Sequence, residues 1–130
     1  MIILYYKTSN GSCRKAMEWF RKHDIEVFEK NIAYIAKKDL LEILALSRTG
    51  FSDILKKRTR CEKHVKAKIE KISSLSFNEA VTFTLMNPDM LKVPLILGEN
   101  KYVVGYNSET IRTFIPKSYR NLELNTKKFL

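Results

Sequence analysis

The sequence predicts an α/β fold in which a β-sheet, built from the two ends of the chain, frames a helical insertion. Three patterns lead to this prediction. Residues 2–29 show a strand, a helix and a strand, residues 37–86 show four helical patterns, and residues 93–105 have the pattern of a β-hairpin. The chain has 130 residues, 45% of them hydrophobic, which suffices for one domain with a buried core and is too short for two ordinary domains.

The N-terminal elements follow from periodicity and turn chemistry. Residues 2–6 form an apolar, β-prone run, and the Thr, Ser, Asn, Gly and Ser of residues 8–12 favour a turn and a helix N-cap. Apolar residues recur at helical spacing over residues 13–23, and residues 25–29 alternate with period two, as in a strand. A strand, helix and strand of this length predict a βαβ unit with parallel strands. The aromatic residues expected on core faces are Tyr5, Trp19, Phe20 and Phe28.

Helical patterns fill the middle of the chain. Residues 37–47 have a broad apolar stripe, and shorter patterns follow at about residues 51–57, 62–72 and 76–86. Gly50 breaks the first of these patterns. A glycine at this position is typical of a helix end, where it adopts the left-handed conformation and satisfies free carbonyls.

The sheet resumes near the C-terminus. Residues 93–97 and 101–105 are β-prone runs separated by Gly, Glu and Asn, which predicts a hairpin, and a last helix is expected at about residues 107–114. Pro94 would suit a cis-proline that opens the third strand, although trans is the default isomer and the sequence does not decide between them. This order of elements is that of a thioredoxin-like fold with an all-helical insertion.

We expect a single domain over residues 1–130. Its core would comprise about residues 1–35 and 90–116, with the helical insertion at about 36–88 and a tail from about 117. The apolar N-terminal run ends at Lys7, too early for a signal peptide or a membrane span, so we expect a soluble, cytoplasmic protein. Two cysteines without neighbours at zinc spacing predict neither a metal site nor a disulfide scaffold, and no cofactor motif is visible.

Positive charge is concentrated in one part of the chain. The sequence has 24 Lys and Arg residues against 14 Asp and Glu residues, a net charge of +10. Residues 51–71 hold eight basic and three acidic residues. Such a run is by default a solvated helical face, and the alternative is contact with nucleic-acid phosphates. No recognition helix or zinc-finger pattern is present, so this chain is not expected to read bases by itself.

Several motifs together resemble one family. Residues 10–16, Asn-Gly-Ser-Cys-Arg-Lys-Ala, followed by Trp19, are similar to the redox loop and first helix of the Spx regulators, which belong to the arsenate reductase-like (ArsC) family. The resemblance continues through Arg-Thr-Gly at residues 48–50, through residues 91–96 and through Val-Gly-Tyr-Asn at residues 104–107 to Pro116. It covers nearly the whole chain.

The resemblance implies a bacterial transcription regulator without enzyme activity. Such a regulator binds the C-terminal domain of the RNA polymerase α subunit and redirects promoter use under thiol stress, and it meets promoter DNA only within that complex. The implied polymerase-binding residues are Gly50, Arg48 and Phe51, and those implied to face DNA or an anion are Lys57, Arg58 and Arg60. Spx tails are recognised by the Clp protease machinery, so the resemblance also implies this partner for residues 125–130.

Two departures from the family pattern argue against a reductase. Asn10 stands where reductases have their nucleophilic Cys and Spx has the first Cys of its Cys-x-x-Cys loop, and an amide cannot form a thiolate. Val93 replaces the Arg that reductases place before the third-strand proline. We therefore expect no catalytic residue. A thiol oxidoreductase or arsenate reductase-like enzyme that uses Cys13 is the alternative function, and a nonspecific nucleic-acid-binding module is a third.

Cys13 and Cys61 are the redox candidates. Cys13 falls in the first turn of its predicted helix, where the helix dipole, Arg14 and Lys15 would lower the pKa of the thiol; the alternative is a small buried hydrophobe. Cys61 is either a plain, partly exposed thiol or a disulfide partner for Cys13, which requires Cα atoms within about 7 Å. Without a Cys-x-x-Cys loop, the output of a regulator would depend on its amount and turnover rather than on a loop disulfide. The alternative is that the chain competes with a switchable paralogue for the same surface of the α subunit.

Overall fold

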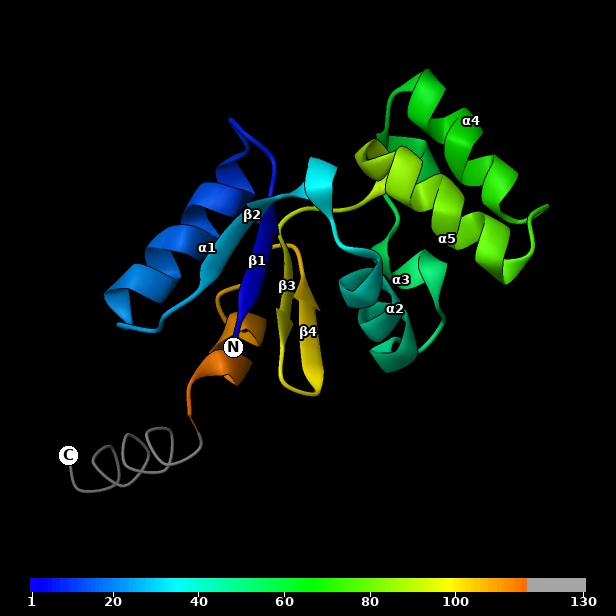
Figure 1. The fold of residues 1–130 in the computed structure, drawn as a ribbon. Coiled ribbons are helices and arrows are strands. Elements are labelled where there is room, and N and C mark those ends of the chain that lie inside the picture. The colour runs from blue at the N-terminus through cyan, green and yellow to red at the C-terminus, as the bar shows by residue number, and fades with distance from the viewer. Residues whose placement is uncertain (117–130) are drawn as a thin grey trace.

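The computed structural model describes residues 1–116, so the predicted tail and its Clp contact lie outside the described residues. A four-stranded mixed sheet has the order β2-β1-β3-β4. Strand β1 (Ile3–Tyr6) pairs parallel with β2 (Phe28–Asn31) and antiparallel with β3 (Leu95–Gly98), which continues antiparallel to β4 (Lys101–Val104). In Figure 1 the N-terminal strands β1 and β2 lie side by side with β3 and β4 from late in the described chain. The predicted α/β, thioredoxin-like arrangement is confirmed.

Helices cover both faces of the sheet. One face packs against α1 (Gly11–Lys22) and the 3-10 helix η4 (Thr110–Phe114). Because side chains alternate along a strand, Leu4, Ile96 and Val103 point to this face. They form one buried cluster with side chains of the two helices: Ala16, Trp19, Phe20, Ile111 and Phe114. The other face receives α2 (Lys37–Leu46). None of the helices within residues 1–116 has the length and apolar character needed to cross a bilayer.

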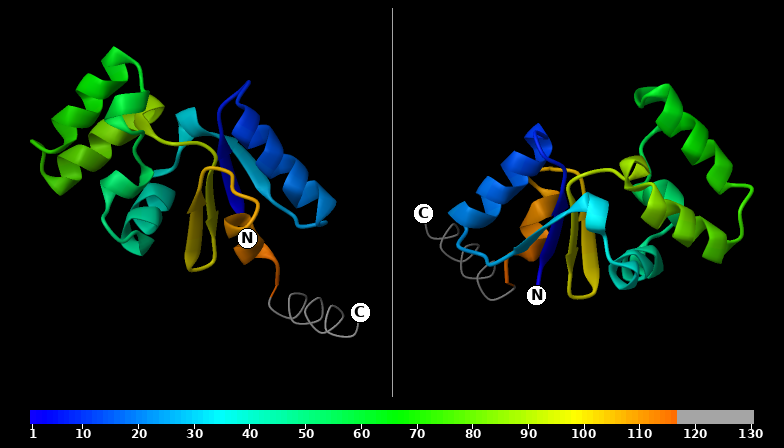
Figure 2. Two further views of the ribbon diagram at one scale, coloured as in Figure 1. Left: turned by 180° about the vertical axis from the view of Figure 1, so that it is seen from behind. Right: turned by 45° about the horizontal axis from the view of Figure 1, so that its top comes forward.

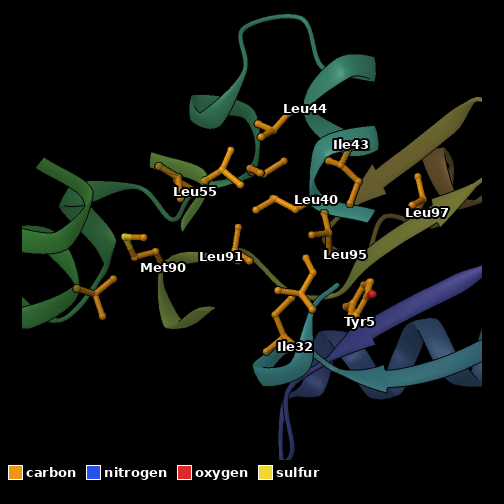
Figure 3. Close-up of a cluster of buried hydrophobic side chains, with 14 residues drawn as sticks. Tyr5, Ile32, Leu40, Ile43, Leu44, Leu55, Met90, Leu91, Leu95 and Leu97 are labelled. Carbon is orange, nitrogen blue, oxygen red and sulfur yellow. The ribbon is translucent and has the colours of Figure 1, made fainter. Parts of the chain in front are cut away.

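The helices α3 (Phe51–Ile54), α4 (Lys63–Ile72) and α5 (Phe77–Met86) follow α2 in the chain. Figure 2 shows them on the side of the sheet away from α1. One hydrophobic cluster connects them to the sheet: in Figure 3, Tyr5 and Leu95 lie on the sheet side, Leu40 of α2 lies between, and Leu91 and Met90 lie toward the helices. The helices of the insertion and this face of the sheet therefore share one continuous core.

A buried polar contact fixes the start of α2 on the sheet. The hydroxyl of Tyr5, fully buried, donates a hydrogen bond to the carboxylate of Asp39 and accepts one from the N–H of Ala36 at 3.3 Å. Burial, and then the neighbouring Asp39, raise the pKa of Tyr5 to about 12. Since both buried groups are hydrogen-bonded, neither carries the cost of an unpaired polar atom.

The second strand differs from its prediction. It begins at Phe28 rather than at Ile25, because the chain turns at Asp24 (φ 52°) and the N–H of Ile25 donates to the carbonyl of Phe20 at 3.0 Å. Ile25 and Val27 instead pack against the cluster beneath α1. The expectation that Phe28 lies on a core face is wrong, because this side chain is 44% exposed, whereas the other three predicted core aromatics are buried.

Two predicted helices are shorter than expected. The one at residues 51–57 stops at Ile54, because Leu55 is extended and forms an antiparallel bridge with Leu91. The last helix is a 3-10 helix rather than an α-helix. The Val93–Pro94 bond, whose isomer the sequence leaves open, is cis.

Candidate functional site

Asn10 and Cys13 lie at the start of α1, Asn10 as its N-cap and Cys13 in its first turn. The side-chain oxygen of Asn10 accepts a hydrogen bond from the N–H of Cys13 at 2.9 Å, so the residue at the family's nucleophile position serves as the helix N-cap. The Cys13 side chain is 2% exposed, and burial raises the pKa of its thiol. Of the two alternatives that the sequence leaves open for Cys13, the thiol whose pKa is lowered by the helix dipole, Arg14 and Lys15 is therefore not supported. The structure favours the alternative in which Cys13 is a small buried hydrophobe.

Cys61 is partly exposed at the end of the 3-10 helix η2 (Arg58–Arg60). Its thiol lies 3.6 Å from the carbonyl oxygen of Arg58, as a weak hydrogen-bond donor. Both cysteines are free thiols, so the Cys13–Cys61 disulfide considered from the sequence is not formed in this structure.

A pocket of about 370 Å³ opens beside Asn10 and is here called the basic pocket. Its lining comprises Asn10, Lys56, Lys57, Arg60, Lys92 and Val93, with four cations and no acidic residue. The two segments that supply the cations run side by side, because the N–H of Lys56 donates to the carbonyl of Met90 at 2.8 Å and that of Lys92 to the carbonyl of Ile54 at 2.9 Å. A concave site with this lining attracts anions.

Only part of the basic pocket was predicted from the sequence. Lys57 and Arg60 line it, whereas the third predicted residue, Arg58, is not among its lining residues. Lys56 and Lys92 were missed. The run of basic residues was a signal for Lys56, but nothing in the sequence places Lys92 beside that run.

Gly50 lies in a turn over residues 47–50, here called the Gly50 turn. The preceding helix ends at Leu46 with Ser47 as its C-cap in an extended conformation, so the prediction that Gly50 ends this helix is wrong; Gly50 is the N-cap of α3. Its dihedral angles, φ 78° and ψ −134°, favour glycine. No heavy atom lies within 4 Å of the position that a Cβ would take, so this position faces open space.

The carboxylate of Asp53 stabilises the Gly50 turn by accepting hydrogen bonds from its backbone. One oxygen accepts hydrogen bonds from the N–H groups of Arg48 and Thr49, at 2.9 and 3.2 Å, and from the hydroxyl of Tyr102 at 3.3 Å. The other accepts from the hydroxyl of Thr49. These bonds, those from Thr49 first, hold the pKa of Asp53 below its usual value. Neither Asp53 nor Tyr102 was predicted from the sequence.

An aromatic pair, half-buried Phe51 and exposed Phe77, adjoins the Gly50 turn. Phe51, which follows Gly50, has its ring centre 6.1 Å from that of Phe77, at the start of α5. Phe77 is 56% exposed, and Arg48 on the turn is exposed as well. The predicted polymerase-binding residues Arg48 and Gly50 lie on the turn and Phe51 begins α3 directly after it, and the fold brings Phe77 beside Phe51.

Comparison with known proteins identifies the family. The sequence profile described as the ArsC family matches residues 5–114. The chain belongs to the ArsC family. Among ArsC-related curated proteins, "Global transcriptional regulator Spx" of Streptococcus agalactiae serotype V is 34% identical over 126 residues, covering 95% of this chain and 90% of the relative. "Global transcriptional regulator Spx 2" of Bacillus cereus is 37% identical over 129 residues, covering 95% and 96%.

Solved structures of ArsC proteins share the fold. The crystal structure of an ArsC family related protein from Bacteroides fragilis superposes with a TM-score of 0.71 at 19% identity, covering 86% of this chain and 95% of that one. The arsenate reductase from Vibrio cholerae superposes with a TM-score of 0.69 at 12% identity, covering 88% and 97%. Because a reductase has this fold as well, the fold does not separate ArsC regulators from ArsC enzymes.

Proposed function

We propose that this ArsC protein is a cytoplasmic, Spx-type transcription regulator that binds the C-terminal domain of the RNA polymerase α subunit, here called the α domain, and alters promoter use. The observation that carries the proposal is the Gly50 turn, a surface with no side chain at its centre. The space beside the Gly50 Cα is open, and the carboxylate of Asp53 accepts hydrogen bonds from the backbone of the turn. A partner can approach such a backbone closely. The Spx relatives at 34–37% identity support the same reading.

The residues around the turn suit a protein contact. Arg48 supplies an exposed cation, and the Phe51–Phe77 pair supplies an aromatic surface beside Gly50. Aromatic and Arg side chains are those most often responsible for the affinity of protein interfaces. We therefore place the α domain against Gly50, Arg48, Phe51 and Phe77.

In the proposed complex the basic pocket faces promoter DNA. Its four cations, with no acid among them, suit phosphate oxygens, which give sequence-independent affinity that falls with salt. In the ternary complex, the logarithm of the affinity should fall linearly with the logarithm of the salt concentration. Replacing either Lys57 or Arg60 with Ala should reduce the magnitude of that slope by about 1. Lys22→Ala, at the far end of α1, is the matched control and should leave the slope unchanged.

The residues at the family's reaction site support regulation rather than catalysis. Asn10 has no thiol and is committed to capping α1, and Val93 has no group to hold an oxyanion. Cys13, the remaining thiol, is buried with a raised pKa, which disfavours the thiolate that nucleophilic attack needs. Without a loop disulfide, we propose that the regulator binds its partner independently of redox state.

Titration of the purified chain against the isolated α domain tests the proposal, with the chain reduced and oxidised. We expect binding in both states, loss of binding in Gly50→Arg, and at least about tenfold weaker binding in Phe77→Ala. Met86→Ala, at the other end of α5 and 76% exposed, is the control and should bind as the unchanged chain does.

If the chain binds the α domain in neither redox state, the proposed function is refuted. Turnover of arsenate or of a mixed disulfide that disappears in Cys13→Ser would instead support a thiol enzyme. Tight DNA binding by the chain alone, with a steep salt slope, would support a nonspecific nucleic-acid-binding module.

A further inference from the structure

The Gly50 turn depends on a residue outside it. We propose that Asp53 is a positioning residue of the partner-binding surface, whose carboxylate holds the turn in the shape that the partner meets. This inference rests on the proposed function, because it takes the Gly50 turn as the contact.

The backbone N–H groups of the turn have only local acceptors. That of Ser47 donates to the carbonyl of Ile43 at 2.9 Å, within α2, and that of Gly50 donates to the hydroxyl of Ser47 at 3.0 Å. The two in the middle, from Arg48 and Thr49, both donate to one carboxylate oxygen of Asp53. Removal of this oxygen therefore leaves two adjacent N–H groups without an acceptor in the protein.

Asp53 is itself held from two sides. Its N–H donates to the carbonyl of Gly50 at 3.1 Å, which closes a ring between the turn and α3. The hydroxyl of Tyr102, on β4 and partly buried against the core, reaches the same carboxylate oxygen from the sheet. None of the ion pairs within residues 1–116 involves Asp53, so accepting these hydrogen bonds is its role in the described structure.

A surface ordered before binding has less conformational freedom to lose on binding. Asn at position 53 keeps the shape of the side chain but removes its charge: the N–H groups of Arg48 and Thr49 would bond to a neutral amide oxygen, and such hydrogen bonds are about half as strong as those to a carboxylate. The turn in Asp53→Asn would then sample other conformations, including at Gly50. We expect at least about tenfold weaker binding of the α domain, with little change in the distant core.

The test compares Asp53→Asn with Asp89→Asn, which makes the same change of charge at an ion pair with Lys68 near α4. Two quantities are measured: the Kd for the α domain, and the amide hydrogen exchange of the free chain. In Asp53→Asn we expect at least tenfold weaker binding and at least tenfold faster exchange at Arg48 and Thr49, with unchanged exchange in the sheet. Asp89→Asn should change neither the Kd nor the exchange rates by more than about twofold.

Tyr102→Phe removes only the hydroxyl bond from β4 and should weaken binding about twofold to fivefold, which keeps the inference testable if Asp53→Asn does not fold. Asp53→Asn with the affinity of the unchanged chain would overturn the inference, and so would a loss that accompanies faster exchange throughout the sheet. Failure of the unchanged chain to bind the α domain would overturn the proposed function, and this inference with it.

Discussion

Substitution of Gly50 separates the backbone requirement of this position from its role at the surface. At φ 78° and ψ −134° a residue with a Cβ is strained, at a cost of about 1–3 kcal/mol. Replacing Gly by Ala also restricts the unfolded chain, which returns about 0.4–1 kcal/mol. The free energy of unfolding should therefore fall by about 1–2 kcal/mol in Gly50→Ala.

Gly50→Arg should cost the free chain no more than Gly50→Ala. No heavy atom lies within 4 Å of the Cβ position, so a longer side chain extends into solvent without a clash. Urea unfolding of both variants measures these costs, and we expect them to agree within about 0.5 kcal/mol. Binding of the α domain, measured on the folded proteins, should be lost in Gly50→Arg, because only the partner would meet the larger side chain.

Two outcomes would refute this reasoning. If Gly50→Arg were destabilised by more than about 1 kcal/mol beyond Gly50→Ala, the space in front of Gly50 would not be open. If neither variant were destabilised, Gly50 would not hold its positive φ in solution.

Three further predictions concern the core and the thiols. Gly98→Ala should lower the free energy of unfolding by about 1–3 kcal/mol in urea, because its Cβ would lie 2.8 Å from the ring of Phe114. A thiol reagent should modify Cys61 rapidly and Cys13 only at the rate of unfolding, as absorbance of the released product would record. The folded chain binds the Tyr5 proton more tightly than the unfolded chain, so stability should hold up to about pH 10 and fall by about 2–3 kcal/mol toward pH 12, as measured by urea titrations at each pH.

Each of these predictions has its own control. Gly11→Ala places a Cβ 3.8 Å from its nearest neighbour and should not destabilise the chain, so equal losses in both glycine variants would contradict the packing argument for Gly98. Rapid modification of two thiols in the folded chain would show that Cys13 is accessible. A Tyr5→Phe variant that kept the full loss of stability between pH 10 and pH 12 would assign that loss to other groups.

Patterns confined to a few residues predicted most elements of the fold. The helices α1, α2, α4 and α5 and the strands β1, β3 and β4 lie within two residues of their predicted bounds, because the spacing of apolar residues and the turn residues between them are local signals. Strand β2 was misplaced, because Ile25 and Val27 alternate as in a strand but pack, partly buried, against the hydrophobic cluster that includes α1, which local sequence does not show.

The sequence by itself determined the family resemblance and the two departures from it at Asn10 and Val93, because each is a change of residue type within a recognisable motif. The tertiary structure alone decided which residues of distant segments meet: Lys92 lies beside Lys56 in the basic pocket, and the hydroxyl of Tyr102 donates to the carboxylate of Asp53. Such pairs form only when distant elements dock in a particular register. That register is set by the packing of the whole core, and no short stretch of sequence contains it.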